Sequence, residues 1–307
     1  MVRRLTQLVL VLVGITLVVF VLMNVVPGNP LAALIDERAA ALDPEAAAMI
    51  RRQWGLDQPL HIQYFRFIAN AVRGDLGRSF VTRQLVVEAI LERLPATLRL
   101  GLAALLVAST VGILAGIVAA VHRGSVFDAL SMVVALGGVS MPVFWLGLLL
   151  MYLLAVKLHL LPPSGYGNGD LRYLVMPAIT LGLAMTAVIA RVTRSAMLGV
   201  IRAEYITTAR AKGLSERVVI YRHAVRNALI PVITVVGVQA GNLLSGAVIT
   251  ETVFNWPGVG RLLIDSIAKR DLPVVQGAVI FIAIMFALIN LAVDIMYAVV
   301  DPRIRYQ

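Results

Sequence analysis

Six uninterrupted apolar stretches constrain this chain more than any other feature. They cover residues 8–26, 100–121, 129–156, 173–190, 228–250 and 272–293, and none contains Lys, Arg, Asp or Glu. Each is close to the roughly 20 residues that a helix needs to cross a bilayer. Lipid offers no hydrogen-bond partners, so the backbone must bond within each stretch, as a helix does. The sequence predicts an all-α polytopic membrane protein with six transmembrane helices.

Composition supports this class, because 60% of the residues are hydrophobic and only 14% are charged. Soluble domains are about half apolar and a quarter charged, so a disordered chain and a typical soluble enzyme are both excluded. The first stretch, about 8–26, has two interpretations. Arg3 and Arg4 precede it, as in a secretory signal peptide, but its apolar run is longer than a signal peptide's. We expect a retained span, with a cleaved signal as the alternative.

The basic residues indicate the orientation of the spans. With the N-terminus in the cytoplasm, the short inner segments hold Arg3, Arg4, Arg123, Arg191, Arg194, Arg202, Arg210, Lys212, Arg217, Arg222, Arg226, Arg303 and Arg305. The short outer loops hold only Lys157, Arg172, Arg261, Lys269 and Arg270. Short cytoplasmic loops are enriched in Lys and Arg, so both termini are predicted to be cytoplasmic. This asymmetry accounts for most of the net charge of +10 without a nucleic-acid partner.

Two segments outside the apolar stretches have predictable helices. In the outer segment, Asp43-Pro44-Glu45 predicts a helix start and Gly55 its end, while Pro59 and Gly74 bound a second helix. A third helix is predicted over 84–94, closed by Pro95. The inner loop 191–227 contains a predicted helix over 203–212, a break at Gly213 and a second helix that begins at Ser215.

The sequence lacks the motifs that mark common catalytic sites. The chain has no cysteine, its four histidines are scattered, and neither a zinc-protease motif nor a Walker A phosphate loop occurs. No nucleophile–base pair is evident from the pattern, so an intramembrane enzyme is disfavoured. We expect no metal or cofactor on this chain. If the protein uses ATP, a partner must hold it.

Polar residues inside the apolar stretches are candidates for a solute path. Gln239, Asn242 and Ser245 recur along one side of the fifth span, and Glu251 lies near its outer end. The alternative is hydrogen bonding between helices. The spacings Gly112-x-x-x-Gly116 and Gly237-x-x-x-Gly241 predict close helix packing.

The run YITTARAKGLSERVVIYRHAVRNALIP (205–231) resembles the signature loop of permease subunits of binding-protein-dependent ABC importers, in the peptide/nickel branch. Further matching segments are VVPGNP (25–30), GLDQPL (55–60), GDLGRSF (74–80), VFNWPGVGRLL (253–263) and DPRIR (301–305). Within that branch, which includes the dipeptide and oligopeptide permeases, NAVRGD (70–75), RDLPVVQ (270–276) and INLAVDIMYA (289–298) are most similar to the glutathione-importer permease.

The resemblance implies the type I ABC importer transmembrane fold. A first helix (about 8–26) and an outer helical segment would occupy 1–92. The transmembrane domain would occupy 93–296, with helices at about 98–121, 129–156, 173–194, 229–251 and 272–299. A coupling loop would cover 199–230, and a cytoplasmic tail 297–307.

The resemblance also implies the residues that contact an ATP-binding subunit. These are Thr207, Ala209, Arg210, Ala211, Lys212, Gly213 and Leu214. The sequence departs from the family pattern E-A-A-x-x-x-G at two positions. Thr207 stands in the position of the glutamate, and Thr208 stands in the position of the first alanine. Nothing therefore assigns the glutamate's contacts to Thr207.

The implied function is half of the translocation pathway of an ATP-driven importer for short peptides, with glutathione and dipeptides as candidate solutes. The implied partners are a second homologous permease, two ATP-binding subunits that hold ATP and Mg, and a periplasmic or lipid-anchored binding protein. The implied location is the inner membrane of a bacterium. The competing hypothesis is an ion-coupled secondary transporter that works alone; no buried carboxylate pair supports it.

Overall fold

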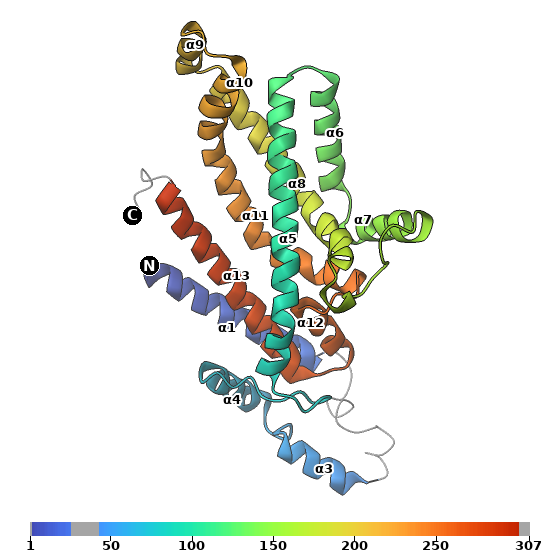
Figure 1. Ribbon diagram of the computed structural model, residues 1–307. Coiled ribbons are helices and arrows are strands. Elements are labelled where there is room, and N and C mark those ends of the chain that lie inside the picture. The colour runs from blue at the N-terminus through green and yellow to red at the C-terminus, as the bar shows by residue number, and fades with distance from the viewer. Residues whose placement is uncertain (1, 26–42, 301–307) are drawn as a thin grey trace. The chain divides into compact units, whose positions relative to one another are not determined.

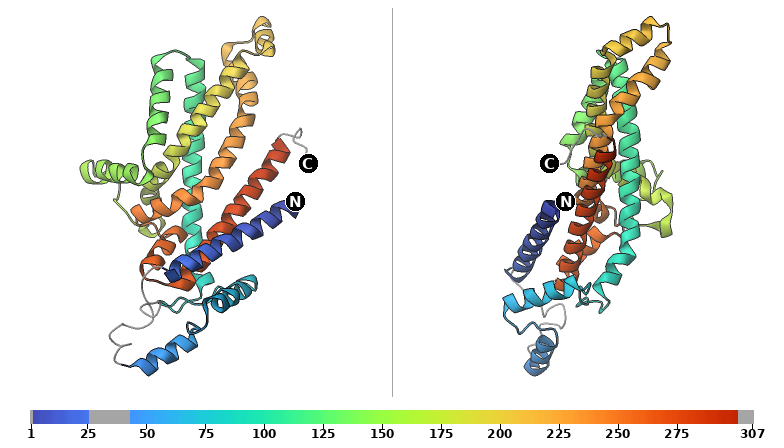
Figure 2. Two further views of the ribbon diagram at one scale, coloured as in Figure 1. Left: turned by 180° about the vertical axis from the view of Figure 1, so that it is seen from behind. Right: turned by 90° about the vertical axis from the view of Figure 1, so that its left-hand side faces the viewer.

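The computed structural model describes residues 2–25 and 43–300 (Figures 1 and 2). Within these ranges every regular element is a helix, and the one bridge between extended residues joins Arg78 and Leu85. The chain forms two compact units. The first combines Met1–Ala96 with Pro257–Ala287, and the second combines Thr97–Trp256 with Leu288–Gln307.

The first unit contains the helices predicted for the outer segment together with parts of the predicted spans. It comprises α1 (Val2–Val25), α3 (Pro44–Gln53), α4 (Leu60–Val72), the start of α5 (Val86–Val121), α12 (Val259–Ala268) and the first part of α13 (Leu272–Val300). Its core joins Val86 and Ile90 of α5 to Val259 of α12 and to Val274 and Ala278 of α13. Residues far apart in the sequence therefore share one apolar core.

Two of the three predicted outer helices are confirmed. Asp43 Oδ1 accepts a hydrogen bond from the Ala46 N–H at 2.9 Å and caps α3, and Gly55 follows that helix at φ +67°. Pro59 precedes α4, and Gly74 follows it at φ +84°. Positive φ suits glycine, which has no Cβ to clash.

The predicted end at Pro95 is wrong. Helix α5 runs without a break from Val86 to Val121, with Pro95 inside it. The buried side chains of Ile90, Ala96 and Leu100 lie on both sides of the proline. We attribute the continuity to this packing, which favours one helix over two despite the lost backbone hydrogen bond.

The second unit is a helical bundle. After α5 it contains α6 (Val126–Ser140), α7 (Val143–Leu150), the π-helical η2 (Met151–Lys157), the short η3 (Gly167–Gly169) and α8 (Leu171–Ile201). It continues with α9 (Glu204–Ala211), α10 (Glu216–Val218), the π-helical η4 (Val219–Val225) and α11 (Arg226–Val253). Helix α8 is central and packs against α6, α7 and α11 (Figure 1).

Glycines permit the close packing of α5 on α8. A Cβ at Gly112 would lie 2.9 Å from Ile189 Cβ, and one at Gly116 would lie 2.6 Å from the carbonyl oxygen of Ala190. On α8, a Cβ at Gly182 would lie 2.7 Å from the carbonyl oxygen of Ala104. The predicted packing role of Gly112 and Gly116 is confirmed. Gly241 likewise lies close to the Asn290 side chain.

Four helical segments of the described chain are long and apolar enough to cross a membrane: Val86–Val121, Leu171–Ile201, Glu216–Leu243 and Leu272–Val293. Two shorter apolar segments are Leu10–Asn24 and Val143–Lys157. A single helix over 129–156 is wrong, because α6 ends at Ser140 and α7 begins at Val143. Met141 between them is extended (φ −86°, ψ 131°), as expected for the residue before a proline. Residues 26 and 301–307 of the predicted termini lie outside the described ranges.

Candidate functional site

The loop between α8 and α11 has the predicted helix–glycine–helix form. Helix α9 ends at Ala211, and Gly213 reverses the chain at φ +75°. Ser215 precedes α10, as predicted, although its side chain makes no capping hydrogen bond. The next helical turns, α10 and η4, lead into α11 without an interruption. The loop therefore ends in a continuous helix that becomes the predicted fifth span.

Apolar packing holds α9 against the second unit. Ile206 and Ala209 are buried together with Ile117 of α5, Met197 of α8 and Val219 of η4. Ile206 is fully buried, and a buried isoleucine contributes about 1.5–3 kcal/mol relative to an exposed one. The loop is thus fixed to the helices on both sides of it.

Polar contacts connect the two arms of the loop. Arg210 Nε donates to Glu216 Oε1 at 2.6 Å, across the turn at Gly213. Asn227 Nδ2 donates to the Tyr205 hydroxyl at 3.1 Å and links α11 to α9. Both contacts are exposed, so each adds little stability but restricts the relative position of the arms.

The residues predicted to meet an ATP-binding subunit divide into two groups. Those exposed at the tip of the loop are Thr207, Arg210, Ala211, Lys212, Gly213 and Leu214. Ala209 is only 7% exposed and belongs to the core beneath α9. A small residue suits position 209, because α9 packs closely on its neighbours at this point.

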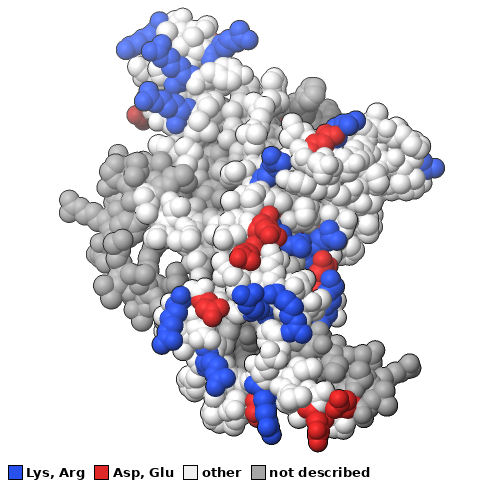
Figure 3. Space-filling model, turned by 60° about the horizontal axis from the view of Figure 1, so that its bottom comes forward, with Lys and Arg blue, Asp and Glu red and all other residues white. Residues whose placement is uncertain are grey.

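The exposed surface of the loop is strongly basic. Its exposed cations are Arg202, Arg210, Lys212, Arg217, Arg222 and Arg226. Figure 3 shows blue side chains gathered at the end of the molecule that carries α9 and α10. The carboxylates of this region are Glu204 and Glu216, and Glu216 is paired with Arg210. A surface of this kind attracts an acidic partner.

The predicted polar residues of α11 occupy different environments. Gln239 is half-buried and Asn242 is exposed, and the Asn242 Nδ2 lies 3.4 Å from Gln239 Oε1. The Ser245 side chain lies outside the described ones. Glu251 is completely buried, and its Oε1 accepts a hydrogen bond from Thr97 Oγ1 at 2.7 Å. Gln239 and Asn242 are thus adjacent, whereas Glu251 is enclosed against α5.

A part-buried ion pair near the loop was not among the predicted site residues. Arg194 of α8 donates from Nε to Asp128 Oδ1 at 2.6 Å and from Nη2 to Oδ2 at 2.7 Å. The Arg194 hydrogen bond, followed by one from the Gly124 N–H, lowers the pKa of Asp128 to about 2. Ser125 and Asp128 also form the first-turn contact expected of an S-x-x-D pattern. That pattern could have identified Asp128, but nothing in it identifies Arg194.

In the ranges that the structure describes, no three His, Cys, Asp or Glu side chains are placed to hold a metal ion. The loop offers instead an exposed tip, a packed underside and a helical connection to α11. Such an arrangement suits contact with another protein.

Two solved structures share the fold. One is described as inward-facing conformations of the MetNI methionine ABC transporter, with a TM-score of 0.56, 16% identity and coverage of 70% of this chain and 97% of that chain. The other, an amino acid ABC transporter, gives a TM-score of 0.51 at 16% identity, covering 71% and 95%. This chain therefore shares its fold with chains of two ABC transporters.

Sequence relatives cover the whole chain. The di/tripeptide transport system permease protein DppB of Pseudomonas aeruginosa is 46% identical, over 99% of this chain and 98% of its own length. The dipeptide transport system permease protein DppB of Escherichia coli K12 is 43% identical, over 99% and 98%. The glutathione transport system permease protein GsiC of Escherichia coli O6:H1 is also 43% identical, over 100% and 98%.

The family models divide the chain in two. The model of the N-terminal membrane component of binding-protein-dependent transport systems matches residues 1–101, and that of the inner membrane component itself matches residues 112–306. The second match covers most of the chain and includes the whole loop between α8 and α11. The chain belongs to the family of binding-protein-dependent transport system inner membrane components.

Proposed function

We propose that this chain is the permease subunit of an ATP-driven importer for short peptides in the inner membrane of a bacterium. Six spans with both termini in the cytoplasm would form half of the translocation pathway. A second homologous permease would form the other half. Two ATP-binding subunits would hold ATP and Mg, and a periplasmic or lipid-anchored binding protein would deliver the solute. The observation that carries the proposal is the exposed, basic loop between α8 and α11.

The loop's contacts support a role in coupling. Its tip is exposed, so a cytoplasmic subunit can reach it, and its underside is fixed by Ile206 and Ala209. The Arg210–Glu216 ion pair restrains the turn at Gly213. Because the loop joins two helices directly, a displacement of its tip would move α8 and α11. The basic charge favours an acidic cleft on the ATP-binding subunit.

The proposed solute class rests on the relatives. Those with the identities given above are named as dipeptide, di/tripeptide and glutathione permeases. The alignment with the glutathione permease spans 306 positions, about the length of this chain. The alignment with the Pseudomonas permease spans 331 positions, so it contains gaps in this chain of 307 residues. The shared chemistry is a short peptide with a free carboxylate, and glutathione and dipeptides are the two solutes to compare.

The test combines a disruptive and a tolerant substitution at one position. Gly213→Pro should abolish peptide-stimulated ATP hydrolysis in membranes that contain all subunits, since proline cannot adopt φ near +75°. Gly213→Asn should retain most of it, because asparagine tolerates positive φ. Co-purification of the ATP-binding subunits separates lost coupling from lost assembly.

Two results would count against the proposal. Normal stimulated hydrolysis by an assembled Gly213→Pro complex would remove the coupling role of the loop. Ion-driven peptide uptake by the purified chain alone in liposomes would favour the secondary transporter.

A further inference from the structure

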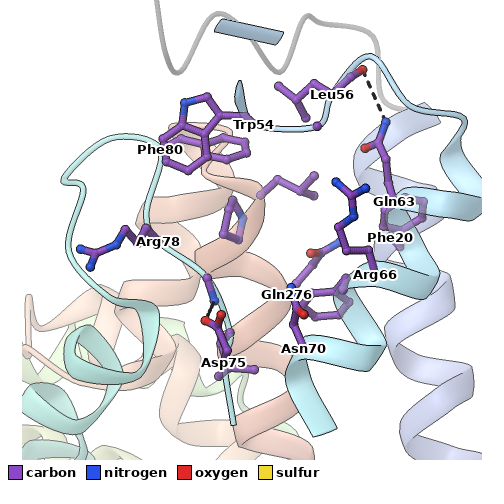
Figure 4. A pocket seen from close by; sticks show the side chains of 16 residues that line it. Phe20, Trp54, Leu56, Gln63, Arg66, Asn70, Asp75, Arg78, Phe80 and Gln276 are labelled. Atoms are coloured by element: carbon purple, nitrogen blue, oxygen red, sulfur yellow. Dashed lines mark hydrogen bonds between the residues drawn. The ribbon is translucent and has the colours of Figure 1, made fainter. Parts of the chain in front are cut away.

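A cavity in the first unit combines polar groups with aromatic walls. It has a volume of about 170 Å³ and lies between α1, the end of α3, α4, residues 75–80 and the start of α13 (Figure 4). Four segments with family resemblance contribute to its lining: GLDQPL, NAVRGD, GDLGRSF and RDLPVVQ. Three of these segments lie between residues 55 and 80 and the fourth lies at 270–276. The proposed coupling role leaves all four unexplained, although they converge here.

One buried group in the lining lacks a partner. The Gln276 side chain is 95% buried (5% exposed), yet its Nε2 makes no hydrogen bond to any described residue. An unpaired buried donor costs about 1–3 kcal/mol. Figure 4 shows the Gln276 amide in the cavity that Trp54 and Leu56 also line. A ligand atom that accepts a hydrogen bond would relieve this cost.

A positively charged side chain also lines this cavity. Arg66 of α4 lines it, has no ion pair with any described residue, and remains exposed, so the cavity can be reached from outside. In Figure 4 the Arg66 guanidinium extends into the space near Gln276, whereas Arg78 extends away from it. A guanidinium and an amide N–H together match the two oxygens of a carboxylate.

The other lining residues indicate which chemical groups a ligand of this cavity would carry. Trp54 and Phe80 form an edge-to-face pair with ring centroids 5.0 Å apart, which offers an apolar wall. Asp75, whose Oδ1 accepts from the Gly77 N–H at 2.8 Å, lies on another side of the cavity and favours a positive group there. The volume corresponds to roughly six water molecules, enough for one or two small residues. These features together suit a zwitterion of small size.

We propose that this cavity binds a short peptide solute, with Arg66 and Gln276 holding its terminal carboxylate. The proposal rests on the proposed function of peptide import and assigns it a binding site in the first unit. Trp54 and Phe80 would contact the apolar side chain next to the carboxylate, and Asp75 would attract the amino group.

The test compares dialanine with dialanine amide, which lacks the carboxylate charge. Cells that carry the chain with its companion subunits would be assayed for uptake of both at low concentration. Arg66→Met and Gln276→Met should each lower dialanine uptake about tenfold or more, the loss expected for a hydrogen bond to a charged group, and should leave amide uptake nearly unchanged. Arg73→Met, at an exposed arginine that does not line the cavity, is the matched control and should leave both unchanged.

A direct binding measurement makes the outcomes separable. The purified full-length chain in lipid nanodiscs is titrated with dialanine, and binding is followed by tryptophan fluorescence. Wild-type cells that import neither dialanine nor glutathione would refute the proposed function, while dialanine binding that is lost in Arg66→Met and Gln276→Met would still support the cavity. An unchanged acid-to-amide ratio with unchanged binding in both variants would overturn the cavity assignment. An equal loss in Arg73→Met would also overturn it.

Discussion

The substitution Gly116→Ala would test whether the glycine sets the distance between α5 and α8. An alanine Cβ at this position would lie 2.5 Å from Thr193 Cβ and 2.6 Å from the Ala190 carbonyl oxygen. Because one of these atoms belongs to the backbone of α8, the contact cannot be relieved by a change of rotamer alone. We expect Gly116→Ala to push the two helices apart.

The magnitude follows from two opposing contributions. Replacing glycine by alanine inside a helix gains about 1 kcal/mol of helix propensity. Overpacking a tight interface costs about 1–3 kcal/mol. Gly101 lies on the same helix and has no atom within 4 Å of an added Cβ, so Gly101→Ala carries only the first contribution. Gly116→Ala should therefore be less stable than Gly101→Ala by about 1–3 kcal/mol.

Unfolding of the purified variants by SDS in mixed micelles, followed by tryptophan fluorescence, measures this difference. The comparison between the two alanines matters more than either comparison with the wild type, because helix propensity cancels. If Gly116→Ala were as stable as Gly101→Ala, the glycine would not set the distance between α5 and α8.

Three further predictions concern polar contacts. Thr97→Val leaves the buried Glu251 without its 2.7 Å donor and should destabilise the chain by about 1–3 kcal/mol in the same SDS assay; an unchanged midpoint would contradict this. The folded-state pKa of Asp128 is lowered from 3.8 to about 2, so its ion pair stabilises the fold above pH 4 and that contribution is lost as the pH falls toward 2. The stability difference between wild type and Asp128→Asn should stay constant from about pH 8 to 5, and a difference that shrinks within that window would refute the assignment. Arg210→Met removes an ion pair whose side chains are 41% and 61% exposed, so stability should change by less than about 1 kcal/mol; a larger loss would mean that the turn depends on this pair.

Two prolines show what local sequence can and cannot predict about this fold. Both are obstacles to a helix, yet Pro142 separates α6 from α7 while Pro95 lies inside α5. At Pro142 the preceding Met141 is extended, as proline alone would favour. At Pro95 the buried residues around it favour a continuous helix. The proline is visible in the local sequence, whereas the packing that decides between the two results involves the surrounding buried residues.

In the functional regions, too, features that depend on neighbouring residues were predictable, and contacts between distant residues were not. The helices and the break at Gly213 were predictable, because caps, charges and a glycine act over a few residues. The Thr97–Glu251 hydrogen bond joins residues 154 positions apart, and the Arg194–Asp128 pair joins residues 66 apart. Contacts at such separations depend on tertiary packing, which residue spacing does not encode. The cavity around Gln276 is a further case, since its lining comes from five separate segments.

The uninterrupted course from α10 through η4 to α11 has a mechanical consequence. Residues 216–253 form one continuous helical segment, which includes the π-helical turns of η4 and Pro231 inside α11. Both features bend helices, and Figure 1 shows that α11 changes direction along its length. Glu251 and its bond to Thr97 lie at one end of the segment, and the exposed basic tip lies at the other. A displacement of the basic tip would therefore be divided between a shift of the far end beside α5 and a change in these bends.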